Sequence, residues 1–296
     1  MRRLKLILFR AAYNLPVTAG IAHGVFARHD LELDIVYTRG SKMVTESLLS
    51  GDCDLGVLSA DDVVYEVETN AADLFIFMGL HGGILQLIGR PGWTAARLKG
   101  TRLGVDDPAS GFALVAHTIL GRLGLKRSDY ETLAIGGHEP RAKALAEGKI
   151  DVTLSTPPFS LELIARGFTL LARAHDYLPC YQASCGVATR RWAANNRDSL
   201  QAYVRAYRES LHWTLDPSNR GALIEQLARE FALKPELAAA TFQALADRED
   251  GLFADARIDR PGIEAVLALR LEAGLLKPPQ PDPAKYCGPP GETATG

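Results

Sequence analysis

Cysteine is scarce in this sequence, and its spacing excludes two classes of protein. The chain has 296 residues and four cysteines, at positions 53, 180, 185 and 287. They show neither the CxxC spacing of a zinc or redox site nor the density of a small disulfide-stabilised domain. Cys53 stands between Asp52 and Asp54, whose charges would raise the pKa of its thiol and make it a poor nucleophile. Because no Ser-His-Asp or HExxH pattern is legible either, we predict no catalytic residue, no metal site and no cofactor.

An excess of charge and a long apolar run are also missing. Lys plus Arg total 33 and Asp plus Glu total 35, and no basic run offers the footprint that a nucleic-acid-binding protein needs. No apolar stretch approaches the length that spans a membrane. The apolar residues 4–9 stop at Arg10 without a cleavage site, which predicts a β-strand rather than a signal peptide. Either the chain is cytoplasmic as written or a secretion signal is missing from it.

The sequence does contain a globular composition, with 47% hydrophobic and 23% charged residues, and a regular alternation of two patterns. Strand-like and helix-like segments follow one another, which is typical of parallel βα units with both sheet faces covered. The predicted fold class is therefore α/β. Strands are expected at residues 4–9, 31–37, 55–58, 74–78, 101–105, 132–135 and 152–154, and helices at 16–28, 42–49, 61–68, 110–123 and 141–147.

One short phrase occurs twice. Residues 47–54 read SLLSGDCD and residues 144–151 read ALAEGKID, so that a Leu, a Gly and an Asp recur ninety-seven positions apart. In both places the phrase predicts a helix end, a glycine cap and an Asp that opens a buried strand. The repeat indicates two lobes built on one plan. We expect Asp54 and Asp151 to serve this architecture and not a ligand.

After about residue 190 helical patterns follow one another without strands between them. Helices are expected at residues 198–215, 219–230, 235–246 and 261–273, and the tail from residue 277 is expected to be extended or loose. Two strand-like crossings, at residues 84–90 and 181–189, would join the lobes and enclose a cleft. The predicted division is residues 1–88 and 186–296 for lobe 1 with the C-terminal helices, and residues 91–182 for lobe 2.

Three stretches carry a resemblance to a known family. They read GVFARHDLELDIVYTRGSKMVTESLLSGDCDLGVLSADD from residue 24, LKGTRLGVDDPASGFALVAHTILGRLGL from residue 98 and HEPRAKALAEGKIDVTLSTPP from residue 138. The chain resembles type II periplasmic solute-binding proteins over roughly residues 4–275. More narrowly, it is similar to the group that binds nitrate, taurine, aliphatic sulfonates and thiamine-pyrimidine precursors for ABC transporters.

The resemblance implies a two-lobed periplasmic-binding-protein type II fold that captures a small molecule in its interlobe cleft for an ABC importer. It implies a periplasmic or extracytoplasmic location and an ABC permease as partner. The alternative is a cytoplasmic enzyme on the same scaffold, a decarboxylase, desulfinase or lyase acting on a small aromatic or heteroaromatic substrate. In that case His81 and Asp61 are the predicted acid–base pair. The cysteine-rich segment of the eukaryotic-type branch, which makes the thiamine pyrimidine, is missing here.

Polar residues follow the strands of the first lobe where loops would meet the cleft. Tyr13 and Asn14 come after the first strand and offer a flat wall with a polar tip and an amide. Ser59 and Asp61 follow the third strand, where the family places ligand contacts. Helix capping explains the same residues equally well, since Ser, Asp and Asn satisfy free N–H groups at helix starts. Ligand contact and capping both remain open for them.

The corresponding loops of the second lobe offer a second set of candidates. Ser110 caps the expected helix, and the N–H groups of Gly111 and Phe112 would be free to bind an anion or a carbonyl. His138 and Thr156 lie in the loops after the next two strands, where turn formation is the competing explanation. The GxxxxGK[ST] spacing of a phosphate-binding P-loop is absent, so no nucleotide is implied.

His81 and Gly82 stand just before the first crossing, where a glycine lets the backbone approach a ligand and a histidine can donate or accept. A buried structural histidine at a hinge is the competing interpretation. Asp61, Asp62 and the pair at 106–107 place carboxylates on both sides of the cleft, and no cation is aimed there. We therefore expect a neutral or weakly basic heteroaromatic or amine ligand rather than an anion, with Asp61 accepting its N–H. Because the two lobes of such a receptor must hinge freely, we also predict that the protein is a monomer.

Overall fold

The structure is a computed structural model that describes residues 1–288, and it contains two separate five-stranded sheets. In the first sheet, β1 pairs in parallel with β2 and β3, while β10 lies antiparallel between β3 and β4. The strand order is β2-β1-β3-β10-β4. The strands are β1 (Arg2–Leu8), β2 (Leu31–Tyr37), β3 (Leu55–Ser59), β4 (Leu74–His81) and β10 (Ser184–Thr189).

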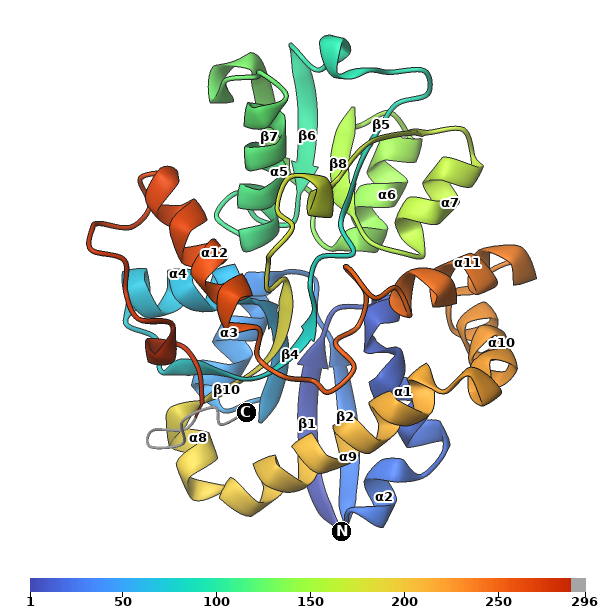
Figure 1. The fold of residues 1–296 in the computed structure, drawn as a ribbon, viewed down its shortest axis with the longest axis vertical. Helices are drawn as coiled ribbons and strands as arrows, with labels where there is room; N and C mark the ends of the chain where they lie inside the picture. Colours follow the sequence, from blue (N-terminus) through green and yellow to red (C-terminus); the bar gives the residue numbers. More distant parts are fainter. Residues whose placement is uncertain (289–296) are drawn as a thin grey trace.

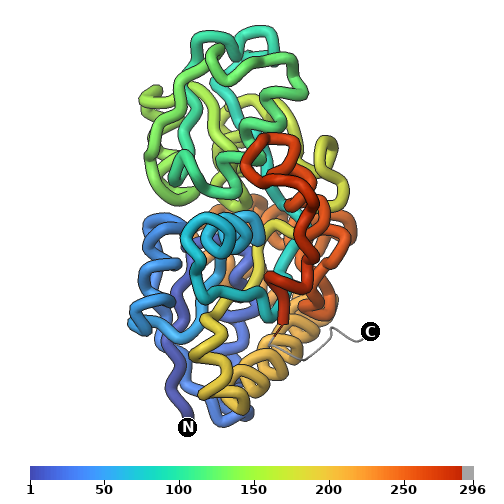
Figure 2. The backbone as a smooth tube through the Cα atoms, turned by 90° about the vertical axis from the view of Figure 1, so that its left-hand side faces the viewer, coloured from blue at the N-terminus to red at the C-terminus, as the bar shows by residue number. Residues whose placement is uncertain are grey.

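The second sheet repeats this plan. Its order is β7-β6-β8-β5-β9, with β6 parallel to β7 and β8, and with β5 antiparallel to β8 and β9. Each sheet therefore takes its fourth strand from a segment that has just crossed from the other lobe. The strands are β5 (Gln86–Gly89), β6 (Thr101–Val105), β7 (Tyr130–Ala134), β8 (Val152–Ser155) and β9 (Thr169–Arg173). Figures 1 and 2 show the two lobes one above the other.

The repeated phrase occupies the same place in both lobes. The Asp54 carboxylate accepts the backbone N–H of Lys5 at 2.8 Å, and the Asp151 carboxylate accepts that of Arg102 at the same distance. Gly51 and Gly148 both adopt positive φ, which a glycine tolerates without strain. The offset of ninety-seven residues also holds for the strand pairing, since Leu6↔Leu55 in the first sheet corresponds to Leu103↔Val152 in the second.

Helices cover the sheets in each lobe. The expected helix at residues 16–28 is two helices, α1 and α2, because Gly24 with φ of +66° interrupts it. The bounds are α1 (Leu15–Ala22), α2 (Val25–Arg28), α3 (Ser41–Ser50), α4 (Ala60–Asn70), α5 (Gly111–Arg122), α6 (His138–Ala146), α7 (Phe159–Ala165) and α8 (Arg190–Asn195). Short 3-10 helices are η1 (Ala12–Asn14), η2 (Ala95–Arg97), η3 (Arg127–Asp129), η4 (Ala174–Asp176), η5 (Pro217–Asn219) and η6 (Pro283–Lys285).

The four C-terminal helices lie close to where the sequence predicts them. They are α9 (Arg197–Leu215), α10 (Arg220–Phe231), α11 (Pro235–Leu245) and α12 (Arg260–Glu272). Helix α9 packs on α1 and α2 of the first lobe, and α12 packs on α4. Helix α11 contacts α7 of the second lobe, so these helices flank the region where the lobes meet. The predicted α/β two-lobed architecture is confirmed.

The tail differs from the prediction over its described part. Residues 277–288 are not loose, because Tyr286 is fully buried and donates its hydroxyl hydrogen to Glu68 at 2.6 Å. Cys287 also forms a parallel bridge with Ile76 at the edge strand β4. The proline- and glycine-rich composition of the tail gave no sign that one aromatic side chain, Tyr286, anchors it. Residues 289–296 lie outside the described part of the chain.

The crossings fall near the predicted positions, with one shift. The predicted boundary after residue 88 lies inside β5, which belongs to the second sheet, so the first crossing precedes Gln86. The second crossing leads into β10 at Ser184. We propose the predicted division into lobe 1 (residues 1–88 and 186–296) and lobe 2 (residues 91–182) with its first boundary moved to just before Gln86.

Candidate functional site

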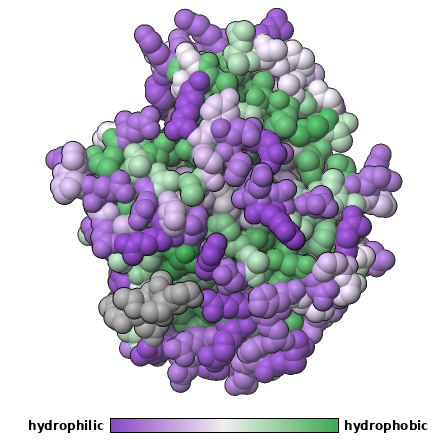
Figure 3. Space-filling model, viewed as in Figure 1, coloured by the Kyte–Doolittle hydropathy of each residue, from purple (hydrophilic) through white to green (hydrophobic). Residues whose placement is uncertain are grey.

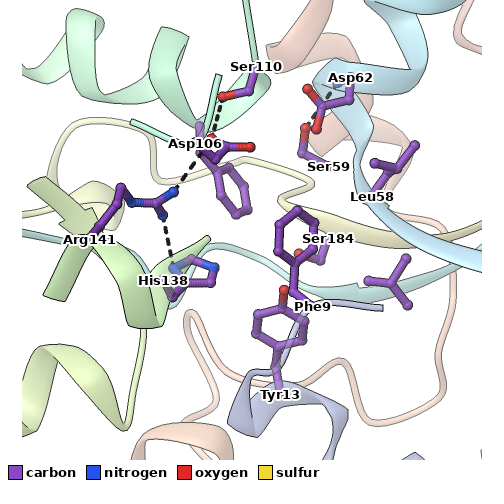
Figure 4. A pocket seen from close by; sticks show the side chains of 12 residues that line it. Phe9, Tyr13, Leu58, Ser59, Asp62, Asp106, Ser110, His138, Arg141 and Ser184 are labelled. Carbon is purple, nitrogen blue, oxygen red and sulfur yellow. Dashed lines mark hydrogen bonds and ion pairs between the residues drawn. The ribbon is translucent and has the colours of Figure 1, made fainter. Parts of the chain in front are cut away.

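The cleft between the lobes contains a small pocket formed by the ends of strands and the starts of helices. Phe9 follows β1, Asp106 follows β6, and Ser59 ends β3, so strand ends from both sheets meet here (Figure 4). Open α/β sheets bind ligands at this edge. The pocket is lined by Phe9, Tyr13, Val57, Leu58, Ser59, Asp62, Asp106, Ser110, Phe112, His138, Arg141 and Ser184.

Two helix starts shape the pocket through their caps. The Ser59 hydroxyl accepts the N–H of Asp62 at 3.0 Å at the start of α4, and the Ser110 hydroxyl accepts that of Ala113 at 3.2 Å at the start of α5. Both serines are thus the caps that the sequence predicts, and they also line the pocket. Capping and contact with a ligand are not exclusive at these positions.

The structure brings five of the predicted ligand-binding residues together. Tyr13 and Ser59 come from the first lobe, and Ser110, Phe112 and His138 come from the second. Figure 4 shows the Tyr13 and His138 side chains directed toward the middle of the pocket.

The remaining candidates lie near this pocket without lining it. Asn14 uses its amide N–H to hold the carbonyl of Phe9 at 2.7 Å, which is a structural role. Gly82 faces the C-terminal loop at Phe253, and Thr156 is buried with a hydroxyl that has no partner within the described chain. Gly111 donates its N–H across the cleft to Asp62 at 2.8 Å instead of leaving it free.

Asp61 does not have the role that we expected from the sequence. It is fully buried and pairs with Arg270 of α12 at 2.5 Å. Burial raises the pKa of Asp61 to about 6, while the Arg270 charge acts in the opposite direction. Its neighbour Asp62 points into the cleft, because consecutive residues of a helix face about 100° apart. The carboxyl group that meets the pocket is therefore that of Asp62.

His81 is buried on the lobe 1 side of the pocket. Its Nδ1 accepts the N–H of Gly83 at 3.2 Å, and its ring centroid lies 4.8 Å from that of Tyr13. Burial lowers the pKa of His81 to about 3, so the ring is neutral. Because Asp61 is engaged by Arg270, the acid–base pair of His81 and Asp61 expected for the enzyme alternative is not formed.

The sequence did not nominate as ligand contacts seven residues that line the pocket, although it noted two of them, Asp62 and Asp106, as carboxylates at the cleft: Phe9, Val57, Leu58, Asp62, Asp106, Arg141 and Ser184. Asp62 and Asp106 stood beside chosen candidates, and each follows a strand end, which is the signal that identifies them. Arg141 stands one helical turn after His138, a spacing that puts both on one face of α6. Ser184 begins the crossing strand and carried no local signal.

Arg141 corrects the expectation that no cation faces the cleft. Its guanidinium is 3% exposed and lies 3.6 Å from the Asp106 carboxylate. It also donates to the carbonyls of Gly136 at 2.7 Å and Leu154 at 3.2 Å, and to Nδ1 of His138 at 3.1 Å. A cation is present, but most of its donors are already engaged by the protein.

The two carboxyl groups of the pocket have different surroundings. Asp106 accepts hydroxyl donors from Ser110 at 2.7 Å and from Ser41 at 3.3 Å, in addition to its ion pair with Arg141. Asp62 has no cation beside it within residues 1–288. Burial raises the pKa of Asp62 to about 8, and the negative charge of Asp106 adds to the effect. Asp62 is therefore largely protonated at neutral pH.

The lobes are closed on one another in this structure. Direct bonds cross the cleft from Gly111 to Asp62 and from Ser41 to Asp106, and the Gly137 N–H donates to the Arg39 carbonyl at 3.1 Å. The cavity that remains is about 10 Å³, which is room for roughly one water molecule. Admitting a larger molecule requires the lobes to separate.

A larger hollow of about 560 Å³ lies elsewhere on the first lobe, beside α8 and α9. Its lining includes Arg190 and Arg208, but none of the residues that the sequence nominates and none at the carboxyl ends of the parallel strands. Over residues 1–288 no cluster of His, Cys, Asp and Glu is arranged to hold a metal ion, and no helix is long and apolar enough to cross a membrane.

Known proteins share this fold and part of this sequence. A family model described as NMT1/THI5 like matches residues 11–219. A search of curated proteins found no match.

Solved structures match the chain over nearly its whole length. The alkanesulfonate-binding protein SsuA from Xanthomonas axonopodis pv. citri, bound to MOPS, is 19% identical with a TM-score of 0.78, covering 97% of this chain and 98% of that one. The ligand-binding component of an ABC-type import system from Staphylococcus aureus, with zinc bound, is 15% identical with a TM-score of 0.80, covering 98% and 97%. The periplasmic nitrate-binding protein NrtA from Synechocystis PCC 6803 is 11% identical with a TM-score of 0.78, covering 96% and 84%. At these identities the likeness concerns the fold.

Proposed function

Because the chain belongs to the NMT1/THI5-like family, we propose that it is a solute-binding protein that captures a small molecule between its lobes and delivers it to an ABC permease. The observation that carries this proposal is the pocket itself, whose lining comes from strand ends and helix starts of both lobes. A ligand held there contacts both lobes at once, so it stabilises the closed form. Delivery to a permease implies a periplasmic or extracytoplasmic location.

The side chains of the pocket favour a neutral or weakly basic heteroaromatic ligand, or an amine, over an anion. Three aromatic rings surround His138, with centroid distances of 6.2 Å from Phe9, 6.3 Å from Tyr13 and 6.1 Å from Phe112. Aromatic walls of this kind suit a flat ring.

The charges of the pocket support the same class. An anion would meet the Asp106 carboxylate, while the Nη donors of Arg141 bind Gly136, Leu154 and His138 and only its Nε is without a partner within residues 1–288. Asp62 and Asp106, rather than Asp61, are then the residues that accept the N–H groups of the ligand. When protonated, Asp62 can also donate to a ring nitrogen.

Thermal unfolding with a ligand panel tests the proposal. A bound ligand raises the melting temperature in proportion to the logarithm of its concentration above the dissociation constant. We expect aminopyrimidines and related amines to do so, and nitrate and alkanesulfonates to have no effect at the same concentrations. Tight binding of a sulfonate would overturn the ligand class, and a flat response to the whole panel would overturn the solute-binding function.

Matched variants locate the binding site. Asp106→Asn should weaken a bound amine roughly tenfold or more, because it removes a charge-assisted hydrogen bond. Asp107→Asn is the control, because Asp107 lies next in the chain, does not line the pocket and only holds the N–H of Ala109 at 2.8 Å. Recovery of the ligand unchanged after denaturation separates binding from turnover.

A further inference from the structure

We propose that His138 recognises an acceptor atom of the ligand through its Nε2–H, and that Arg141 is the positioning residue that keeps the imidazole in this tautomer. The inference rests on the proposed function in one respect, namely that the pocket takes a small molecule. It adds a residue outside the predicted set and a direction for one hydrogen bond.

The contact between Arg141 and His138 fixes where the imidazole proton lies. Nη2 of Arg141 is 3.1 Å from Nδ1 of His138. A guanidinium has only donors, so the Nδ1 atom at the other end must be an unprotonated acceptor. The proton of the neutral ring then resides on Nε2. Burial, with the charge of Arg141 adding to it, lowers the pKa of His138 well below its usual range, which keeps the ring neutral.

Arg141 is itself held in place. Backbone carbonyls of Gly136 and Leu154 accept two of its N–H groups, and the Asp106 carboxylate balances its charge. The Gly136 carbonyl lies just before α6, and the Leu154 carbonyl lies in β8. The guanidinium is therefore held both by the loop that leads into α6 and by a strand of the second sheet. Both Nη atoms are engaged and, within residues 1–288, Nε is the guanidinium nitrogen without a partner, so a two-pronged contact with an anion would require one of these bonds to break. Its effect on a ligand therefore passes through His138 and Asp106.

The position of His138 makes its free nitrogen available to a ligand. The residue is 3% exposed and lines the pocket, with the rings of Phe9, Tyr13 and Phe112 around it (Figure 4). Nδ1 faces Arg141, and within residues 1–288 Nε2 forms no hydrogen bond. An uncharged donor enclosed by aromatic rings selects an uncharged acceptor on a flat molecule, such as a ring nitrogen or a carbonyl oxygen.

Nitrogen NMR of the imidazole rings tests the tautomer directly. The His138 signal is assigned by its loss in His138→Gln. In the parent protein we expect the Nε2–H tautomer, with no titration of His138 between pH 5 and pH 8. In Arg141→Met we expect a mixture of both tautomers, and in Arg141→Lys the Nε2–H form should be largely restored, because a lysine still donates to Nδ1. A purely structural role of Arg141 would not alter the tautomer.

A ligand pair tests recognition. 4-Aminopyrimidine carries ring nitrogens as acceptors, and aniline has the same shape without them. We expect 4-aminopyrimidine to shift the Nε2 signal of His138 and to bind at least tenfold more tightly than aniline, a preference that Arg141→Met should lose.

Each result bears on a distinct claim. An Nδ1–H tautomer in the parent, or an unchanged tautomer in folded Arg141→Met, overturns the role of Arg141, and the parent spectrum decides even if that variant does not fold. Equal affinity for the two probes overturns recognition by His138. If neither probe nor any other panel member binds, the proposed function fails instead, while the tautomer assignment is still decided by the spectrum of the free protein.

Discussion

Replacing Asp62 by Asn is expected to make the protein more stable at neutral pH. Asp62 is buried in the cleft, the described part of the chain places no cation beside it, and its Oδ1 accepts the N–H of Gly111 at 2.8 Å. Asn has the same shape, keeps a carbonyl oxygen for that N–H and never ionises. The substitution therefore removes the free-energy cost of protonating this carboxyl group on folding and retains the hydrogen bond between the lobes.

The size of the effect follows from the pKa. Burial and the charge of Asp106 raise the pKa of Asp62 from 3.8 to about 8. The folded protein holds a proton that the unfolded chain releases, so the free energy of unfolding falls as the pH rises from about 4 to about 8. The slope is about 1.4 kcal/mol per pH unit, or roughly 4 kcal/mol by pH 7. This is an upper bound, because opening the cleft rehydrates the carboxylate without unfolding the lobes.

Urea unfolding of both proteins between pH 4 and pH 9 measures the difference. The parent and Asp62→Asn should be about equally stable near pH 4, and the variant should gain steadily up to about pH 8. Asp61 titrates in both proteins, so its contribution cancels. Asp107→Asn is the control and should leave the pH dependence unchanged. A pH dependence in Asp62→Asn that equals that of the parent would refute the reasoning.

Three further outcomes are expected. Gly111→Ala places a Cβ against the Ser59 hydroxyl and the Asp61 Cβ across the cleft, so the lobes can no longer close fully. The affinity for 4-aminopyrimidine, measured by calorimetry, should fall more than tenfold. Gly121→Ala in the same helix is the control, because its Cβ meets open space, and it should leave the affinity unchanged. Arg270→Met leaves Asp61 buried without its cation and should cost about 3–5 kcal/mol in urea unfolding at pH 7, with partial recovery when Asp61→Asn is added; an unchanged midpoint would contradict the pairing. Light scattering should give the monomer mass of 32.1 kDa, in keeping with the interspersed hydrophilic and hydrophobic residues on the face in Figure 3; a stable dimer that closes the cleft would contradict it.

The general fold was predictable because it depends on local periodicity. The alternation of strands and helices, the four C-terminal helices and the repeat of Asp54 and Asp151 all follow from patterns a few residues long. Strand β5 was expected only as part of the crossing at residues 84–90, while strand β9 and helix α7 are short and lack a distinct period, so they were missed. The docked tail depends on one side chain, Tyr286, whose burial no local pattern announces.

The site was predictable only as a set of loops. Sequence placed ligand contacts after the strand ends, and Tyr13 and His138 do line the pocket. It could not decide between Asp61 and Asp62, because that choice depends on Arg270, which lies 209 residues away in the chain. The distribution of charge in a cleft is set by contacts between segments that are far apart in the chain, and local sequence patterns do not reveal which residues form these contacts.

The offset of ninety-seven residues also shows where the two lobes have diverged at the cleft. Phe9 and Asp106 occupy the same slot in the two lobes, and both line the pocket. At this slot the first lobe contributes an aromatic ring and the second a carboxylate. A molecule bound between the lobes would therefore meet unlike groups at equivalent positions of a repeated scaffold. Such a guest is expected to be asymmetric and to enter in a single orientation.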